Sequence, residues 1–159
     1  NICHTDGDAW SLSSNAAYQA VEDHDGNIWI ATYGGGVNIL RKNKAGKYIA
    51  IHAKNALKRY PQSAHQKVRT LAVDKDGKVW AGTTDGILIM QMRNNNVTIE
   101  EMRMTDRLED GLMSNDIVYL ACDAKGTMWI GTNSGGLSCV TGRDEHGGYK
   151  FKNYVIHLK

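Results

Sequence analysis

The sequence predicts an all-β protein built from three four-stranded antiparallel units, and three observations support this prediction. The pattern Gly-x-[IVM]-Trp-[IA]-[GA]-Thr occurs at residues 26–32, 77–83 and 126–132, with its tryptophans 51 and 49 residues apart. Shifting the first unit by 100 positions aligns it with the third over about thirty residues without a gap. The chain has 17 Gly but a single Pro, Pro61, as expected for strands that need every backbone donor.

The third unit shows the expected elements in order. We predict a first strand over 116–122, a tight turn over 124–126 and a second strand over 127–132. A glycine turn at 133–135 leads to a third strand over 136–141. A looser loop leads to a fourth strand over 149–155. The other units repeat this order, with fourth strands near 47–52 and 97–104. Glycine at the first turn supplies the positive φ that a tight hairpin requires.

The second strand of each unit decides the predicted architecture. Residues 28–31 and 128–131 are apolar on both faces, so the sheet must be covered on both sides. Antiparallel units of about 50 residues that cover one another are blades of a β-propeller, so the sequence predicts an incomplete, three-bladed segment. We expect one propeller fragment over 1–159, with blades at 12–60, 61–108 and 109–159. Trp29, Trp80 and Trp129 are then expected to pack between blades, a structural role.

Composition excludes several other classes of protein. Hydrophobic residues make up 42% of the chain and charged residues 23%, so intrinsic disorder is not expected. Neither a membrane-spanning apolar run nor a signal peptide is recognisable. Cys3, Cys122 and Cys139 have unrelated spacings and are expected to be buried thiols that form at most one disulfide.

The residues resemble a known repeat, the two-component regulator propeller repeat. Ser-Asn, an Asp-x-x-Gly turn, the tryptophan strand and Gly-Gly follow one another at 14–37 and again at 114–137. The second copy departs from the pattern, because His65-Gln66 replaces Ser-Asn and Asp85-Gly86 replaces the glycine pair.

This resemblance implies a biological setting. Such repeats form the periplasmic sensor region of membrane-anchored hybrid histidine kinases of the Bacteroidetes type, and the ligands are typically oligosaccharides. The resemblance therefore implies an extracytoplasmic sensing segment that passes its signal to a downstream kinase. It also implies further propeller blades outside these 159 residues. Two alternatives stay open: an enzyme of the streptogramin-lyase type, and a propeller that serves only as a protein assembly surface.

Topology points to one end of the blades as a ligand site. In an antiparallel meander, the loop before the first strand and the turn between the second and third strands lie at the same end, and binding groups are commonly carried on such loops. Amide, hydroxyl, imidazole and aromatic groups there suit sugar hydroxyls, although the same residue types also cap turns. The predicted ligand-binding residues are Asn15, Tyr33, His65, Thr84, Asp85, Asn115, Asn133 and Ser134.

No residue pattern predicts catalysis, a cofactor or a metal. Asp23-x-Asp25-Gly26 and Asp74-x-Asp76-Gly77 resemble the start of a calcium loop, but the later ligands are missing. A hairpin turn in which Asp accepts local amide hydrogens is the preferred interpretation. We therefore predict no catalytic residue, no cofactor and no metal ligand in this sequence.

Charge is distributed unevenly. No acidic residue occurs between Asp25 and Asp74, an interval that carries nine Lys and Arg residues, among them Arg41, Lys58 and Arg59. This pattern is typical of a solvated basic face, and it also suits an anionic glycan or an acidic partner. Nucleic acid is not expected as a partner, because aromatic residues are not interleaved with the arginines.

Three blades also leave two apolar lateral faces open. Such faces are normally covered, so we expect the isolated chain to self-associate, with two copies forming a six-bladed arrangement as one option.

Overall fold

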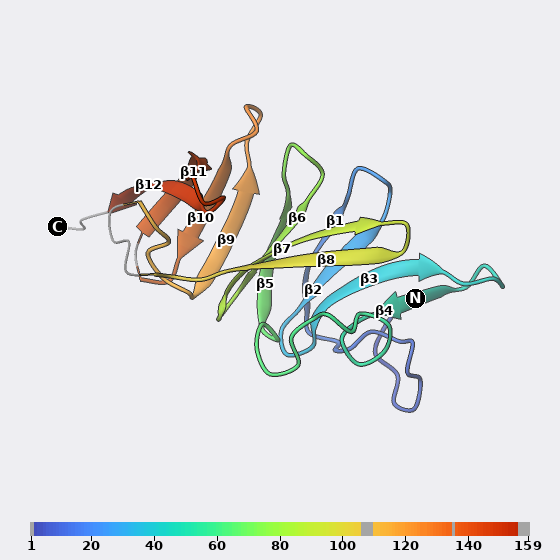
Figure 1. Ribbon diagram of the computed structural model, residues 1–159. Coiled ribbons are helices and arrows are strands. Elements are labelled where there is room, and N and C mark those ends of the chain that lie inside the picture. The colour runs from blue at the N-terminus through green and yellow to red at the C-terminus, as the bar shows by residue number, and fades with distance from the viewer. Residues whose placement is uncertain (1, 106–109, 135, 156–159) are drawn as a thin grey trace.

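The computed structural model describes residues 2–105, 110–134 and 136–155, which form twelve strands in three four-stranded antiparallel sheets (Figure 1). The sheets correspond to the three predicted blades, and the all-β fold class is confirmed. Blade 1 is β1 Ala17–Glu22, β2 Ile28–Thr32, β3 Gly36–Lys42 and β4 Tyr48–Ile51. Blade 2 is β5 Val68–Val73, β6 Val79–Thr83, β7 Gly86–Arg93 and β8 Asn96–Met102. Blade 3 is β9 Ile117–Cys122, β10 Met128–Thr132, β11 Gly136–Arg143 and β12 Tyr149–Val155.

Strands within each blade follow one another in sequence order, as a simple meander. The first strands lie side by side, β1 against β5 and β5 against β9, and the sheets fan outward from them (Figure 1). Two side chains connect these inner strands at equivalent positions. The amide of Leu71 donates to Gln19 Oε1 at 2.8 Å, and the amide of Leu120 donates to Thr70 Oγ1 at 3.1 Å.

The turn between the first and second strands is built identically in each blade. In blade 1, Asp23 Oδ1 accepts the amides of Asp25 and Asn27 at 3.0 and 2.9 Å, and Asp23 Oδ2 accepts Trp29 Nε1–H at 2.8 Å. Gly26 has φ +83°, as the tight turn requires. One carboxylate thus fixes both the turn and the rotamer of the following tryptophan.

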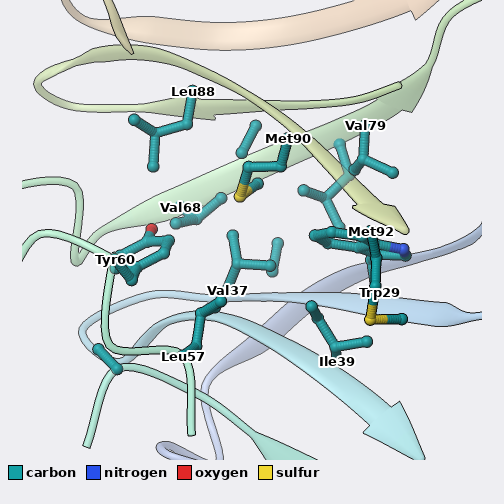
Figure 2. Packing of buried hydrophobic residues seen from close by; sticks show 14 residues of the cluster. Trp29, Val37, Ile39, Leu57, Tyr60, Val68, Val79, Leu88, Met90 and Met92 are labelled. Carbon is teal, nitrogen blue, oxygen red and sulfur yellow. The ribbon is translucent and has the colours of Figure 1, made fainter. Parts of the chain in front are cut away.

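Blades 1 and 2 are joined by an apolar layer (Figure 2). Trp29 is fully buried there, and Val37 and Ile39, which point to the same face of β3, are buried beside it. Val79 and Met90 of blade 2 face them from the other sheet, also with no exposed surface. Because side chains alternate between the two faces of a strand, these apolar residues of β2 and β3 all face blade 2.

Blades 2 and 3 repeat this arrangement on the opposite face of blade 2. Trp80 is 2% exposed and belongs to a cluster with Ile87, Ile117 and Met128. Gly82 lies in the same layer, and a Cβ there would come within 2.5 Å of Thr70 Cγ2 and 2.6 Å of Ile117 Cγ2. The two sheets are therefore packed closely enough that Gly82 leaves no room for a methyl group.

The lateral face of blade 3 has no sheet beside it among the described residues. Trp129 is half-buried there and stacks on Tyr154, with ring centroids 6.1 Å apart. Tyr119 is 56% exposed and Tyr154 is 39% exposed. The apolar residues that would form a third interface are thus present but partly in contact with solvent.

Three details differ from the sequence predictions. The predicted fourth strand over 97–104 ends at Met102, because the amide of Met104 turns away to donate to Asn115 Oδ1 at 2.5 Å. Of the three cysteines expected to be buried, only Cys139 is; Cys122 is half-buried, Cys3 is exposed, and all three are free thiols. Gly135 of the predicted second turn, and 106–109 at the predicted boundary of blades 2 and 3, lie outside the described residues.

Candidate functional site

The site lies at the end of the blades where β1, β5 and β9 begin, called here the loop end. Each of these strands has a β-bulge near its start, revealed by a register shift against the second strand. The extra residue is Tyr18 in blade 1, Arg69 in blade 2 and Val118 in blade 3. Bulges of this kind re-aim a side chain and are enriched next to functional sites.

Tyr18 and Tyr33 form a stacked aromatic pair at the loop end of blade 1. Their ring centroids are 5.4 Å apart and the ring planes differ by 10°. Tyr18 is 59% exposed, so the pair presents an aromatic surface to solvent. Tyr33 is held in place because its amide donates to the Ala16 carbonyl at 2.8 Å.

Cations from blade 2 surround this aromatic pair. Lys67 Nζ and Arg69 Cζ each lie 5.7 Å from the centroid of the Tyr33 ring, within range of a cation–π interaction. Arg69 also donates to Asp116 Oδ1 of the loop before β9 at 2.6 Å. Arg69 therefore connects the aromatic pair of blade 1 to blade 3.

Electrostatics keep Arg69 charged in this position. Burial lowers its pKa, but interactions with Tyr33 and Asp116 outweigh this effect and raise the pKa above its ordinary value. Asp116 neutralises part of that charge, whereas Lys67 is exposed and has no carboxylate within ion-pair distance among the described residues. The cluster of Tyr18, Tyr33, Lys67, Arg69 and Asp116 is called the loop-end cluster below.

Asn15 and Asn115 occupy equivalent loop positions, where their side chains are engaged within the chain. Asn15 Oδ1 accepts the amide of His4 at 2.7 Å, as Asn115 Oδ1 accepts that of Met104. In both loops the preceding serine accepts an amide two residues ahead, at 3.1 Å. The Ser-Asn motif thus connects the segment before blade 1 and the segment before blade 3 to the start of the first strand of that blade.

His65, Thr84 and Asp85 form a second group at the loop end of blade 2. His65 is fully buried and has φ +60°. Its Nδ1 lies 2.9 Å from Thr83 Oγ1, and its amide donates to Asp85 Oδ2 at 3.0 Å. Half-buried Thr84 joins the group through its amide, which donates to the Lys67 carbonyl at 3.2 Å. His65 is part of the loop's internal support.

The His65 ring is neutral near pH 7. Burial lowers its pKa by more than the nearby Glu101 carboxylate raises it. Nε2 lies 3.3 Å from Glu101 Oε2. Glu101 is also bound by Arg103, whose Nε donates to Oε1 at 2.5 Å. The buried neutral imidazole of His65 therefore has a structural role in this loop, and protonation of the ring would destabilise the loop.

Asn133 and Ser134 are exposed in the turn between β10 and β11. The amide of Asn133 donates to the Asp116 carbonyl at 2.9 Å, which places this turn beside the residue that holds Arg69. The structure thus links Tyr33 and Asn133 to the two sides of one charged pair. His65 and Asp85 form a separate, internal group.

Sequence reasoning missed Tyr18, Arg69 and Asp116. The repeat contained the signal, because Tyr18, Arg69 and Val118 each stand three residues after the second residue of the Ser-Asn or His-Gln pair. A position that varies from Tyr to Arg to Val in otherwise regular copies, at the start of an inner strand, was a candidate for function.

The carboxylates of the turn aspartates accept hydrogen bonds from residues of their own blades. Asp74 and Asp123 repeat the bonding of Asp23, accepting two turn amides each and the Trp80 or Trp129 indole N–H at 2.9 Å. This is the hairpin-turn arrangement expected from the sequence. Within residues 2–105, 110–134 and 136–155, no group of three or more His, Cys, Asp or Glu side chains is arranged to hold a metal ion.

Comparison with solved structures shows similarity to propellers of several kinds. The extracellular domain of a protein described as a hybrid two component system from B. thetaiotaomicron is 26% identical over 90% of this chain, with a TM-score of 0.63. The chain spans 18% of the length of that domain. A catalytically inactive virginiamycin B lyase from Staphylococcus aureus, solved with quinupristin, is 14% identical over 91% of this chain and 43% of its own, with a TM-score of 0.56.

An auxiliary nutrient binding protein from Bacteroides ovatus gives the same TM-score of 0.56 at 14% identity, over 91% of this chain and 32% of its own. At 14% identity, the likeness to the lyase and to the nutrient binding protein is one of fold. No protein with a curated description matches the sequence. No helix long and apolar enough to cross a membrane occurs in the described part of the chain.

The family comparison agrees with the repeat read from the sequence. Residues 11–34, 62–85 and 111–134 each match the two component regulator propeller family. Each match begins shortly before the first strand of a blade and ends in the turn after its second strand. The chain therefore carries three two component regulator propeller repeats, one in each blade.

Proposed function

We propose that the chain is an extracytoplasmic ligand-sensing segment of a hybrid two-component receptor, and that it binds an oligosaccharide at the loop end. The observation that carries this proposal is the 26% identity, over 90% of the chain, to the extracellular domain of a protein described as a hybrid two component system. The three family repeats support the same assignment.

The loop-end cluster supplies the chemistry for this proposal. The stacked pair of Tyr18 and Tyr33 offers an apolar surface on which one face of a sugar ring can lie. Lys67, the phenol hydroxyls and the nearby turn of Asn133 and Ser134 offer hydrogen-bond partners for sugar hydroxyls. Lys67 also favours a uronic or sulfated sugar, because it has no carboxylate partner among the described residues.

The position of Arg69 supports a proposed route for signal transfer. Its side chain contacts Tyr33 of blade 1 and Asp116 of blade 3, so a ligand that displaces Tyr33 would alter the contacts that blade 2 makes with both neighbours. We propose that this change is passed through the remaining propeller blades to a downstream kinase. The chain itself has no proposed catalytic role, and the lyase likeness, being one of fold, carries no activity to it.

Calorimetry with oligosaccharides identified on a glycan array tests the binding proposal. Tyr33→Ala and Arg69→Gln should each weaken binding at least about tenfold, since each removes a central contact. Tyr48→Ala is the matched control, because Tyr48 is 51% exposed on β4 and also lies near a lysine, Lys42, but is outside the loop-end cluster. Retention of full glycan affinity by Tyr33→Ala would place the ligand elsewhere.

We propose further that the isolated chain pairs with a second copy through the lateral face of blade 3. Tyr119, Trp129 and Tyr154 leave aromatic surface there that a neighbouring sheet covers at the other two interfaces. Light scattering across a concentration series should show a dimer that Tyr119→Lys dissociates. A monomer at every concentration would contradict the pairing and leave the glycan proposal untouched.

A further inference from the structure

A groove of about 400 Å³ lies at the outer rim between blades 1 and 2, far along the blades from the first strands. Its sides are β3 and β4 of blade 1, the segment after β4, and the β7–β8 hairpin of blade 2. This volume falls in the range of about 300–1,000 Å³ that is typical of small-molecule sites. The groove is called the rim groove below.

The floor of the rim groove is aliphatic. It is lined by the buried side chains of Ile39, Leu57 and Met92 and the half-buried ones of Ile51 and Val97. The two uncharged polar side chains in the lining are Asn95 of the β7–β8 turn and Asn96, the first residue of β8. The lining residues include no aromatic ring, so the floor suits an alkyl or aryl chain better than a sugar.

The rim of this groove is cationic and without a counter-charge of its own. Arg41, Lys58 and Arg59 line it, and none of its lining residues is acidic. Within the described residues, none of these three cations is in an ion pair or a hydrogen bond of its side chain. An adjoining hollow, which shares Arg41, Met92 and Asn95 with the rim groove, adds Arg93 and the carboxylate of Asp25. The acid-free interval of the sequence thus gathers three of its cations around one apolar groove.

A groove between blades 2 and 3 provides an internal comparison. It has a similar volume, about 380 Å³, and also contains a methionine, Met128. Its lining has four cations, Lys75, Lys78, Lys125 and Arg143, together with the carboxylates of Asp74 and Asp76, so half of its positive charge has a counter-charge in the same lining. The rim groove differs because its lining contains cations and no carboxylate.

We propose that the rim groove binds an amphipathic anion, a small molecule with an alkyl or aryl body and a carboxylate, sulfate or phosphate head. The body would lie on Ile39, Leu57 and Met92, removing apolar surface from water, while the head would lie among the three cations. This site is separate from the loop-end cluster, and its test does not depend on glycan binding.

Methionine-methyl NMR of the full chain tests the proposal with octanoate as the probe. The Met92 methyl signal should shift saturably, whereas that of Met128 in the comparison groove, where two carboxylates offset part of the positive charge, should move much less. Octanol and octyltrimethylammonium, with the same chain and a neutral or positive head, should shift Met92 much less. Equal movement of Met92 and Met128, no movement of Met92, or an equal response to octanol would overturn the proposal.

Charge variants sharpen the test. Arg41→Gln with Arg59→Gln should weaken octanoate binding about fivefold or more, since two favourable charge contacts are lost. Lys44→Gln with Lys47→Gln removes two exposed charges of the same acid-free interval outside the groove and should change the affinity less than about twofold. Equal loss of octanoate affinity in both double variants would mean that only the net charge of the chain matters, and would overturn the proposed site.

Lys58→Glu is an independent second variant at one exposed position, where a change of side chain should not affect folding. It places a carboxylate at the rim of the groove and should abolish the octanoate-dependent shift of Met92 without altering the spectrum of the free chain. Unchanged octanoate affinity in this variant would contradict the proposal.

Discussion

Trp29 and Trp129 make the same contacts within their own blades but differ in how much a neighbouring blade covers them. Each follows the same turn, and each indole donates to the turn aspartate, at 2.8 and 2.9 Å. Trp29 is fully buried because blade 2 lies against it, whereas Trp129 is half-buried on a face with no neighbour among the described residues. The comparison teaches that the repeat encodes the blade, and that an adjacent blade supplies the burial.

Truncation of the two tryptophans should give the largest difference. Trp29→Ala removes a fully buried indole from the layer between blades 1 and 2 and should lower the free energy of unfolding by about 3–5 kcal/mol. Trp129→Ala should cost about 1 kcal/mol, since part of its surface is already solvated. Urea unfolding of both variants measures this difference, and equal losses would mean that the face of blade 3 is covered in solution.

Removal of the turn carboxylate should come next. Asp23→Ala removes the acceptor of two backbone-amide hydrogen bonds and leaves the buried Trp29 indole N–H without its acceptor. The expected loss in the free energy of unfolding is about 2–3 kcal/mol. Asp123→Ala breaks the same three bonds where water can replace the carboxylate, so its loss should be smaller. Thermal unfolding of the two variants measures both losses. A larger loss of stability in Asp123→Ala than in Asp23→Ala would contradict this prediction.

A methyl group added at equivalent glycines probes the same contrast. Gly82→Ala places Cβ within 2.6 Å of both Thr70 and Ile117 in the tight layer between blades 2 and 3, and should destabilise the chain by about 2 kcal/mol. At Gly131, on the open face, the nearest atom would be Tyr119 Cβ at 3.2 Å. Gly131→Ala should therefore be nearly neutral in urea unfolding. A comparable loss at both positions would show that the two faces are equally filled.

Acidification should produce the smallest effect, through buried His65 at the loop end. Burial lowers the pKa of His65, so the unfolded chain takes up a proton at a higher pH than the folded chain. Stability should therefore fall as pH drops below about 6.5, the ordinary pKa of His. His65→Gln should reduce this slope, which urea unfolding between pH 7.5 and pH 5 measures. His146→Gln is the matched control for loss of an exposed imidazole, and an identical slope in both variants would contradict the assignment.

Most of the fold was predictable from the sequence because it is local and repeated. The turn of Asp23 and Gly26 and the strand that follows depend on residues within one blade, and the three copies allow each assignment to be checked against the others. The predicted end of β8 was wrong because it depends on a distant partner, Asn115, which captures the amide of Met104.

The candidate site was less predictable for a related reason. Topology places Tyr33 and Asn133 at the loop end, but the residues that join them, Arg69 and Asp116, belong to different blades and are 47 positions apart. The bulges that re-aim Tyr18 and Arg69 depend on strand register, which residue type alone does not reveal. Whether these residues bind sugar is a prediction for the glycan experiment.

Hydrogen exchange of the tryptophan indole N–H groups tests the central claim most directly. All three repeat indoles donate to an aspartate at 2.8–2.9 Å, so differences in their exchange report on coverage by a neighbouring blade. At concentrations where light scattering shows a monomer, Trp29 and Trp80 should exchange slowly and Trp129 much faster. If Trp129 in the monomer exchanged as slowly as Trp29 and Trp80, the claim that its face lacks a covering sheet would be contradicted.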